Sequence, residues 1–286
     1  MQGFLKRNNL SYRVCTAERR PPIDQKEVDT FNKLLQKAID DTSDRIILNC
    51  DESCWRVMMP PKRSIVKRGQ DSVKLNIDGD QKAGFTIIGT ISSDGAKLPL
   101  VIIAKGRTKR CHKQLGKHPN FSYKVFHSEK GWTTEAVFSE YLEWIRCIIG
   151  EKKISLVVDQ WGPHFGPKAA KKAEDLDIHL IPVPKGGTSV YQPLDRKIFA
   201  IMKKKGAAKW VRMCHNNPRM KWTKSTATAI ALQCWEEIKE HHILSAWKCK
   251  GDPSGSESES SDSCNVFIPE RRKETNKFTR IFLRYQ

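Results

Sequence analysis

The sequence lacks a long apolar segment and an apolar signal core at its N-terminus. No run approaches the roughly 20 apolar residues that are needed to span a bilayer. Hydrophobic residues make up only 38% of the 286 positions, which favours one main domain of about 200 residues with extensions. The sequence therefore predicts a soluble intracellular protein without a membrane partner.

The cysteines lack the spacing of a disulfide framework or a zinc site. There are 9 of them, an odd number, and no two are arranged as Cys-x-x-Cys. Reduced structural thiols are therefore expected. A zinc site built from Cys111-His112, Cys214-His215 and His241-His242 is the alternative, but the repeated spacing that makes zinc signals specific is missing.

Acidic residues are few relative to basic ones. Lys and Arg number 51 against 32 Asp and Glu, which gives a formal net charge of +19. Such an excess favours a polyanionic partner, because bound cationic side chains release counterions and steer the encounter. A merely solubilising surface is the alternative.

Three carboxylates follow apolar segments. Residues 46–53 form a short apolar run that ends on Asp51 and Glu52, and residues 154–159 repeat the pattern and end on Asp159. Both runs are typical of buried strands that carry an acid to an exposed end. Asp195 follows a proline at the expected first turn of a helix. Three carboxylates at element ends indicate a divalent-metal site.

The remaining segments predict a mixed sheet with helices on its faces. Asp94-Gly95 between two β-rich runs is a strong hairpin signal, so the first three strands are expected to form an antiparallel meander. Apolar residues at helical spacing predict helices around the sheet, one of them ending at Gly150. The expected strands cover residues 46–53, 85–91, 98–104, 154–159 and 178–183; the expected helices cover 28–39, 137–149 and 167–176, with further helices beyond Trp210. This order, βββαβαβα, predicts an α/β fold with a five-stranded mixed sheet flanked by helices and extra C-terminal helices.

The order of strands and acids is that of the ribonuclease H-like fold, and three motifs indicate which family of this fold the chain resembles. Asn49-x-Asp51-Glu52, then Asp159 with His164, then the segment 184–195 ending in Gln-Pro-Leu-Asp, resemble the DDE superfamily endonuclease domain of pogo- and jerky-type transposases in the mariner group. The resemblance spans roughly residues 45–210. Its third acid is Asp, as in the pogo branch.

The resemblance implies a chemistry. Asp51, Asp159 and Asp195 would be the catalytic residues and would hold two Mg²⁺ or Mn²⁺ ions for in-line displacement at a phosphodiester. Asp51 would bridge both ions, with Asp159 on one and Asp195 on the other. Taken alone, each acid is equally well read as a surface carboxylate or a helix cap.

Three residues near the acids are expected to support the metal site without binding the metal themselves. Glu52 points to the opposite face of its strand and is expected to bind a backbone amide or a base. His164 either orients the metal site, contacts a phosphate or caps the following helix. Gln160 stands where the family commonly has Asn, and its longer arm could disturb the site and reduce activity.

The resemblance makes DNA the expected polyanion. A solvated surface is the alternative for the basic clusters, and Trp132, Trp144 and Trp235 are expected in the core. The basic residues expected to contact DNA phosphates are Lys62, Arg63, Lys67, Arg68, Arg107, Lys109, Arg110, Lys203, Lys204 and Lys205.

The resemblance also sets the expected domains. Residues 1–20 are interpreted as the remnant of an upstream helix-turn-helix DNA-binding region. The start at Met1 would then reflect a truncated gene copy, a misplaced start, or a protein that has lost its sequence-specific DNA-binding region. Residues 21–215 form the DDE endonuclease domain, 216–250 a C-terminal helical extension, and 251–286 a disordered acidic, serine-rich linker with a basic tail.

The expected function is that of a nuclear, transposon-derived endonuclease and transposase that cleaves and transfers DNA strands, with a homodimer as a further expectation. A domesticated nucleic-acid-binding protein that keeps the fold without catalysis is the main alternative. A structural module that binds a protein partner through its basic face is the third.

Overall fold

A six-stranded mixed sheet organises the chain in the computed structural model, which describes residues 7–8, 23–41, 45–60, 83–217 and 219–248. The strand order is β4-β3-β2-β1-β5-β6. The β1–β2 and β2–β3 pairs are antiparallel, and the other neighbours are parallel. The strands are β1 (Arg45–Arg56), β2 (Gly84–Ser92), β3 (Leu100–Lys105), β4 (Tyr123–Ser128), β5 (Lys153–Val158) and β6 (Ile178–Pro182).

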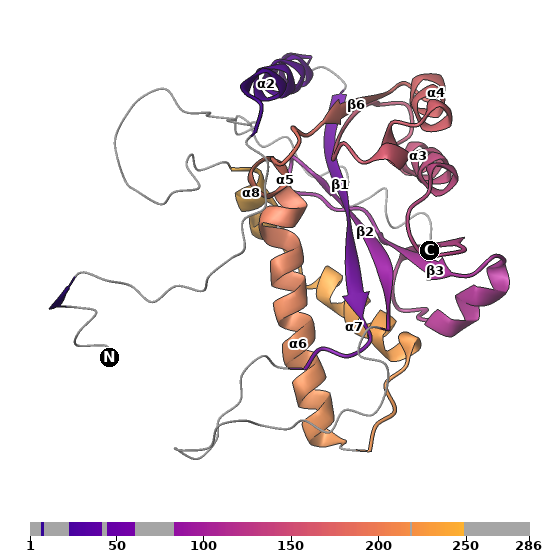
Figure 1. The fold of residues 1–286 in the computed structure, drawn as a ribbon. Coiled ribbons are helices and arrows are strands. Elements are labelled where there is room, and N and C mark those ends of the chain that lie inside the picture. Colours follow the sequence, from indigo (N-terminus) through magenta and orange to yellow (C-terminus); the bar gives the residue numbers. More distant parts are fainter. Residues whose placement is uncertain (1–6, 9–22, 42–44, 61–82, 218, 249–286) are drawn as a thin grey trace.

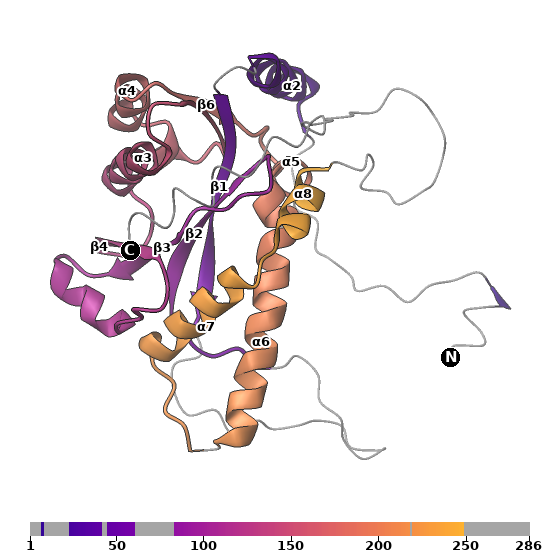
Figure 2. The ribbon, with the colours of Figure 1, turned by 180° about the vertical axis from the view of Figure 1, so that it is seen from behind.

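Helices cover both faces of the sheet (Figure 1). Two of them, α3 and α4, pack with one face of β1 and β5 in one apolar cluster, and α2, α6, α7 and α8 pack in the other. Figure 2 shows α7 and α8 against the same side of the sheet as the long α6. The helices are α2 (Gln25–Asp40), η1 (Lys109–Leu115), α3 (Glu135–Ile149), η2 (Gly162–His164), α4 (Pro167–Asp175), α5 (Thr188–Tyr191), η3 (Leu194–Ile198), α6 (Phe199–Asn216), α7 (Lys224–Glu236) and α8 (Glu240–Trp247).

Local sequence signals explain the ends of α3. The side chain of Thr134 accepts a hydrogen bond from the Val137 N–H at the N-cap. The helix ends at Gly150, whose φ of 75° suits glycine. The expected helix over 137–149 is therefore confirmed, as are the antiparallel meander, the ribonuclease H-like class and the C-terminal helices.

The expected count of five strands is wrong, because β4 adds a sixth. This strand lies at the edge of the sheet and pairs in parallel with β3 alone. Its residues are mostly half-buried or exposed, since one side of an edge strand has no neighbour. Its apolar pattern is therefore weak, and the sequence left it inside a connection.

The first strand is also longer than expected. It continues past Asp51 to Arg56, and it stays paired with β2 along this extension. Its parallel pairing with β5 stops earlier, at Asn49 opposite Val157. The segment 46–53 therefore does not end on its acids; they lie beside the place where the neighbouring strand stops.

Two glycines let η3 and α6 approach the strands closely. A Cβ atom on Gly89 would lie 3.1 Å from Leu194 and 3.2 Å from Phe199, and one on Gly206 would lie 2.8 Å from the ring of Trp55. Because Gly89 is the β2 partner of Asp51, its missing side chain allows η3 to pack directly beside the acid.

Several expectations concern residues that lie wholly or partly outside the described part of the chain. The tail at 251–286, nearly all of segment 1–20, and four of the expected DNA-contacting residues (Lys62, Arg63, Lys67 and Arg68) lie outside the described residues. The core assignment holds for Trp235 and is wrong for Trp132, a residue that is 64% exposed. Trp144 is half-buried against the apolar cluster of α3 and α4. No described helix combines the length and apolarity that crossing a membrane requires.

Candidate metal centre

Two neighbouring parallel strands bring the first two acids together. The register pairs Asn49 with Val157, so Asp51 and Asp159 each follow two residues later along adjacent chains. Asp51 remains within β1, whereas Asp159 comes directly after the last residue of β5. The two acids therefore lie where β5 stops beside the continuing β1, a place that we call the notch of the sheet.

Asp51 is a buried carboxylate in acidic surroundings. The residue is 5% exposed, and its Oδ1 accepts a hydrogen bond from the Glu52 N–H at 2.8 Å. Burial raises the pKa of Asp51 well above its usual value, and the charges of Asp195, Glu52 and Asp159 raise it further. The two other predicted site aspartates, Asp195 and Asp159, are thus both near enough to act on Asp51.

A buried network fixes Asp195 relative to β1. The side chain of Asn49 donates to the Val157 carbonyl at 3.0 Å and accepts from the Leu194 N–H at 3.1 Å. Gln192 donates to the Cys50 carbonyl at 3.2 Å. The Gln-Pro-Leu-Asp motif therefore serves to attach the start of η3 to the strand that carries Asp51, and Asp195 lies exposed beside it.

On the other face of β1, His164 joins Glu52 to Asp159. Its Nε2 lies 3.0 Å from Glu52 Oε1, and its Nδ1 lies 2.7 Å from Asp159 Oδ1. Burial alone would lower the pKa of His164, but hydrogen bonds to Asp159 and Glu52 and the charges of these carboxylates outweigh it and raise the pKa to about 10. His164 is therefore an imidazolium at neutral pH and links the ends of β1 and β5.

Gln160 points away from the acids. Its side-chain amide donates to Glu27 of α2 at 3.1 Å, and the same Glu27 oxygen accepts the Lys185 N–H at 2.8 Å. The longer side chain thus connects the end of β5 to α2 and to the loop before α5. Whether the longer side chain reduces activity stays a prediction.

The residues present fit a divalent cation. Oδ2 of Asp51 is buried and has no hydrogen-bond partner among the described residues, and carboxylates held together repel one another unless a cation neutralises them. Hard oxygen donors suit Mg²⁺ or Mn²⁺. Glu52, Asp159 and His164 also lie close enough to share an ion. Both nitrogens of His164 are occupied by carboxylates, however, so the imidazolium acts as the cation there.

The alternative zinc site has no support in the described residues. The group of Glu52, Asp159 and His164 is the one set of three metal-ligating side chains found there, and it contains no cysteine. The six described cysteines are free thiols, as expected: Cys50, Cys54, Cys111, Cys147, Cys214 and Cys234.

Some of the described basic side chains are exposed, and others are paired with a carboxylate. Lys109 and Arg110 lie exposed in η1, and Lys203 and Lys204 lie exposed on α6. Arg107 pairs with Glu129 at 2.5 Å, and Lys205 pairs with Glu237 at 2.8 Å. Arg107 and Lys205 are therefore less available to an external phosphate.

Sequence reasoning missed the link through His164 and the position of Trp132. Histidine and Glu52 are 112 residues apart, so no local pattern predicts their contact. Trp132 follows a glycine and precedes the Thr-Thr pair at the start of α3. That loop position was the available signal that its indole does not belong to a helical apolar face.

The mixed sheet, with one acid within β1, one directly after β5 and one in η3, defines a ribonuclease H-like domain of the transposase type. Residues 82–247 match the family described as DDE superfamily endonuclease. This match covers more than half of the chain, and the chain belongs to that family. Asp159 and Asp195 lie inside the matched segment, and Asp51 precedes it.

Similar proteins agree with this assignment. Two relatives named "Pogo transposable element with KRAB domain", from Homo sapiens and Mus musculus, are each 24% identical over 155 residues, which cover 53% of this chain and 25% of the relative. The chain thus spans about a quarter of these relatives' length. The structure "Crystal structure of a pre-cleavage Mos1 transpososome" has a TM-score of 0.50 and 12% identity, covering 87% of this chain and 71% of that one. At this identity the likeness concerns the fold alone.

Proposed function

We propose that this chain is a metal-dependent DNA endonuclease and strand transferase of transposon origin that acts in the nucleus, with a second copy of itself as a partner on DNA. The observation that supports the proposal is that Asp195 of η3 and Asp159, directly after β5, both lie near enough to Asp51 of β1 to raise its pKa. The net charge of +19 supports DNA as the substrate.

Asp51, Asp159 and Asp195 would hold two Mg²⁺ or Mn²⁺ ions. When bound, such ions activate the attacking oxygen and stabilise the leaving oxygen of a phosphodiester displacement. The chain's own residues do the positioning: Asn49 and Gln192 hold the start of η3, and His164 holds Asp159 against Glu52. The exposure of Asp195 leaves the notch open to a DNA strand.

A DNA-binding protein without catalysis is the second candidate. It is favoured by Gln160, which occupies the family's Asn position and donates to Glu27 instead of supporting the acids. In this case the acids would form a metal site that binds DNA without cleaving it.

The test is cleavage by a fusion of the full chain to a foreign DNA-binding domain, which supplies recruitment to a known site. The fusion should cut near that site with Mg²⁺ or Mn²⁺ and fail with Ca²⁺, a larger ion with looser coordination. Asp195→Asn should slow cutting by at least about 100-fold. Asp175→Asn, an exposed acid at the end of α4, is the matched control and should cut normally. Recruited protein that never cuts would favour the second candidate.

A further inference from the structure

Exposed aromatic side chains gather beside the candidate metal centre. Within the part of the chain that the structure describes, five large apolar side chains are exposed, and three of them are Trp132, Trp161 and Phe165. Trp161 and Phe165 belong to the segment that carries Asp159 and His164. Exposed tryptophan is costly in water, so its concentration at one place indicates a binding surface.

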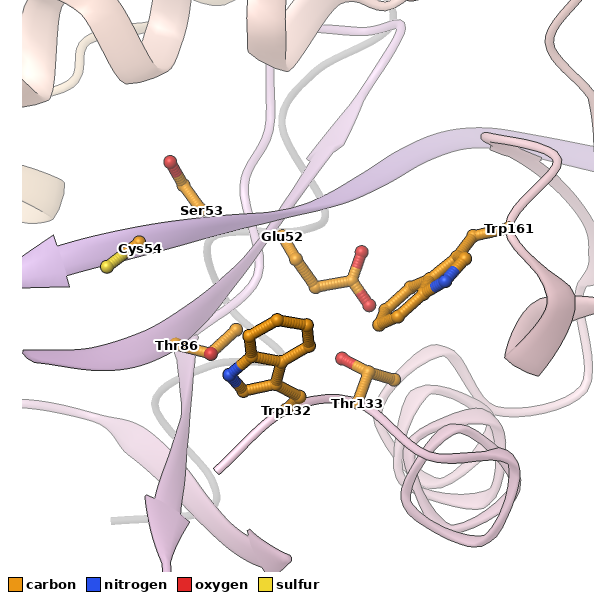
Figure 3. A pocket seen from close by; sticks show the side chains of 7 residues that line it. All are labelled: Glu52, Ser53, Cys54, Thr86, Trp132, Thr133 and Trp161. Atoms are coloured by element: carbon orange, nitrogen blue, oxygen red, sulfur yellow. The ribbon is translucent and has the colours of Figure 1, made fainter. Parts of the chain in front are cut away.

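Trp132 and Trp161 line a pocket together with Glu52 and Thr133. Figure 3 shows the two indoles on different sides of the Glu52 carboxylate, one from the loop after β4 and the other from the loop after β5. Glu52 also contacts His164. The pocket therefore adjoins the acids but lies on the opposite face of β1 from Asp51.

The backbone that carries Trp132 is fixed. The Gly131 N–H donates to the Ser128 carbonyl at 3.0 Å, the Gly131 carbonyl accepts from the Thr86 hydroxyl at 2.8 Å, and the Trp132 carbonyl accepts from the Ser128 hydroxyl at 2.6 Å. Gly131 has a φ of 76°, which few other residues adopt. An exposed indole on so constrained a turn is preorganised to meet a partner.

Thr133 supplies an unpartnered polar group in the same pocket. The residue is 3% exposed, and its hydroxyl has no hydrogen-bond partner among the described residues. Figure 3 shows this hydroxyl on the side of the pocket that faces Glu52. Buried hydroxyls are normally satisfied, so Thr133 indicates that a ligand with a polar edge belongs there.

A ligand with flat faces, a polar edge and a negative charge fits these features. Two indoles offer stacking surfaces and Thr133 offers a hydrogen bond. The exposed Lys130 precedes the turn that carries Trp132, and the exposed Lys105 lies against Gly131 of that turn. A nucleotide has all three properties, whereas a base inside a duplex has its faces covered. We infer that the pocket binds one unstacked nucleotide of the DNA, on the face of β1 opposite Asp51. The inference rests on the proposed function, because it takes DNA as the substrate.

The test is binding to two DNA duplexes in EDTA, where neither metal nor cleavage is needed. One duplex carries a single unpaired 2-aminopurine nucleotide, and the other is fully paired. Base stacking on an aromatic side chain contributes ~1–3 kcal/mol, so Trp132→Ala should weaken binding of the first duplex about 5- to 140-fold. Trp132→Phe should restore most of this loss, and the paired duplex should bind all variants alike. Val211→Ala, an exposed apolar residue of α6, is the control.

The fluorescence of 2-aminopurine supplies the second readout, since stacking on indole quenches it. Quenching by the wild type that is lost in Trp132→Ala supports the inference. Unchanged affinity and unquenched fluorescence in a protein that still binds DNA overturn the inference alone. A wild type that binds neither duplex overturns the proposed function, and the inference with it.

Discussion

The backbone N–H of Leu194 donates a hydrogen bond of 3.1 Å to Oδ1 of the buried Asn49. Asn49 precedes Asp51 by two residues on β1, and Leu194 precedes Asp195 by one. The contact therefore sets the relation between two of the three proposed catalytic acids without including either of them. Positioning of this kind is expected where small displacements of reacting groups are costly.

Asn49→Ala should reduce both stability and cleavage. It removes the hydrogen bonds to the Leu194 N–H and the Val157 carbonyl, and each buried polar group left unpaired costs about 1–3 kcal/mol. Denaturant unfolding and the cleavage rate of the fusion measure the two effects. Asn216→Ala, at the exposed end of α6, should change neither. Normal cleavage by a folded Asn49→Ala protein would contradict the positioning role.

Gly89→Ala should push η3 away from β2. The added Cβ would lie 3.1 to 3.3 Å from Leu194, Phe199 and Trp235, and such overpacking costs about 1–3 kcal/mol. Denaturant unfolding would report this cost. Gly162→Ala is the matched control, because a Cβ there meets nothing within 4 Å. Equal stability of the two variants would show that η3 does not pack as closely as described.

Asp51→Asn should stabilise the metal-free protein at neutral pH. Burial and the neighbouring acids raise the folded-state pKa of Asp51 above the unfolded value. The folded chain then binds more protons than the unfolded chain between these two pKa values, so stability falls as pH rises through that window. In EDTA at pH 7.5 the variant should unfold about 2–4 °C higher for each kcal/mol relieved.

The pH profile is the control for the Asp51 prediction. Below the unfolded pKa the wild type and Asp51→Asn should unfold at equal temperatures, since Asp51 is then protonated in both states of the wild type. Asp175→Asn should follow the wild type at every pH. Parallel profiles for wild type and Asp51→Asn would refute the acidic surroundings described for Asp51.

His164→Ala should destabilise the fold in a pH-dependent way. Its folded-state pKa of about 10 exceeds the ordinary value of 6.5, so the stabilisation is complete below pH 6.5 and is lost as pH rises through 10. The loss at pH 6 should be ~2–4 kcal/mol, less than for a fully buried pair because Asp159 is partly exposed. Unfolding curves at pH 6 and pH 10 should therefore differ in the size of the variant's effect. His215→Ala, an exposed histidine, should show no such difference.

Lys204 and Lys205 should differ in their effect on DNA binding. Lys204 is exposed, whereas Lys205 pairs with Glu237. Each phosphate contact contributes about 1 to the slope of log K against log salt. Lys204→Ala should lower the slope by about that amount, and Lys205→Ala should lower it less. Titrations at several salt concentrations would decide this, and a larger change for Lys205→Ala would contradict the pairing.

The sequence contained the signals for the acids and for most of the frame. Apolar runs ending at Asp51 and Asp159 determine two neighbouring strands, and Gly95 and Gly150 mark a turn and a helix end. The edge strand β4 was missed because its burial is one-sided and its pattern is therefore faint. The extension of β1 to Arg56 was missed because the basic, glycine-bearing stretch from residue 55 onward was interpreted as a connection.

Contacts across long sequence distances were harder to predict. The charge state of His164 depends on Glu52, 112 residues earlier, and on burial that only packing creates. The exposure of Trp132 depends on the turn at Gly131, whereas its residue type alone favours the core. The partners of a side chain and its exposure are thus tertiary properties. For this reason the sequence alone did not predict the charge of His164 or the exposure of Trp132.

The central claim is that the three aspartates form a metal centre that cuts DNA. The most direct test measures the cleavage rate of the recruited fusion against the amount of Mn²⁺ it binds, followed by electron paramagnetic resonance on the same samples. The wild type should cut at a rate that rises with bound Mn²⁺, while Asp51→Asn and Asp195→Asn bind less metal and cut at least about 100-fold more slowly. Wild-type protein that is fully loaded with Mn²⁺ and leaves its DNA intact, or that still cuts in EDTA, would contradict the account.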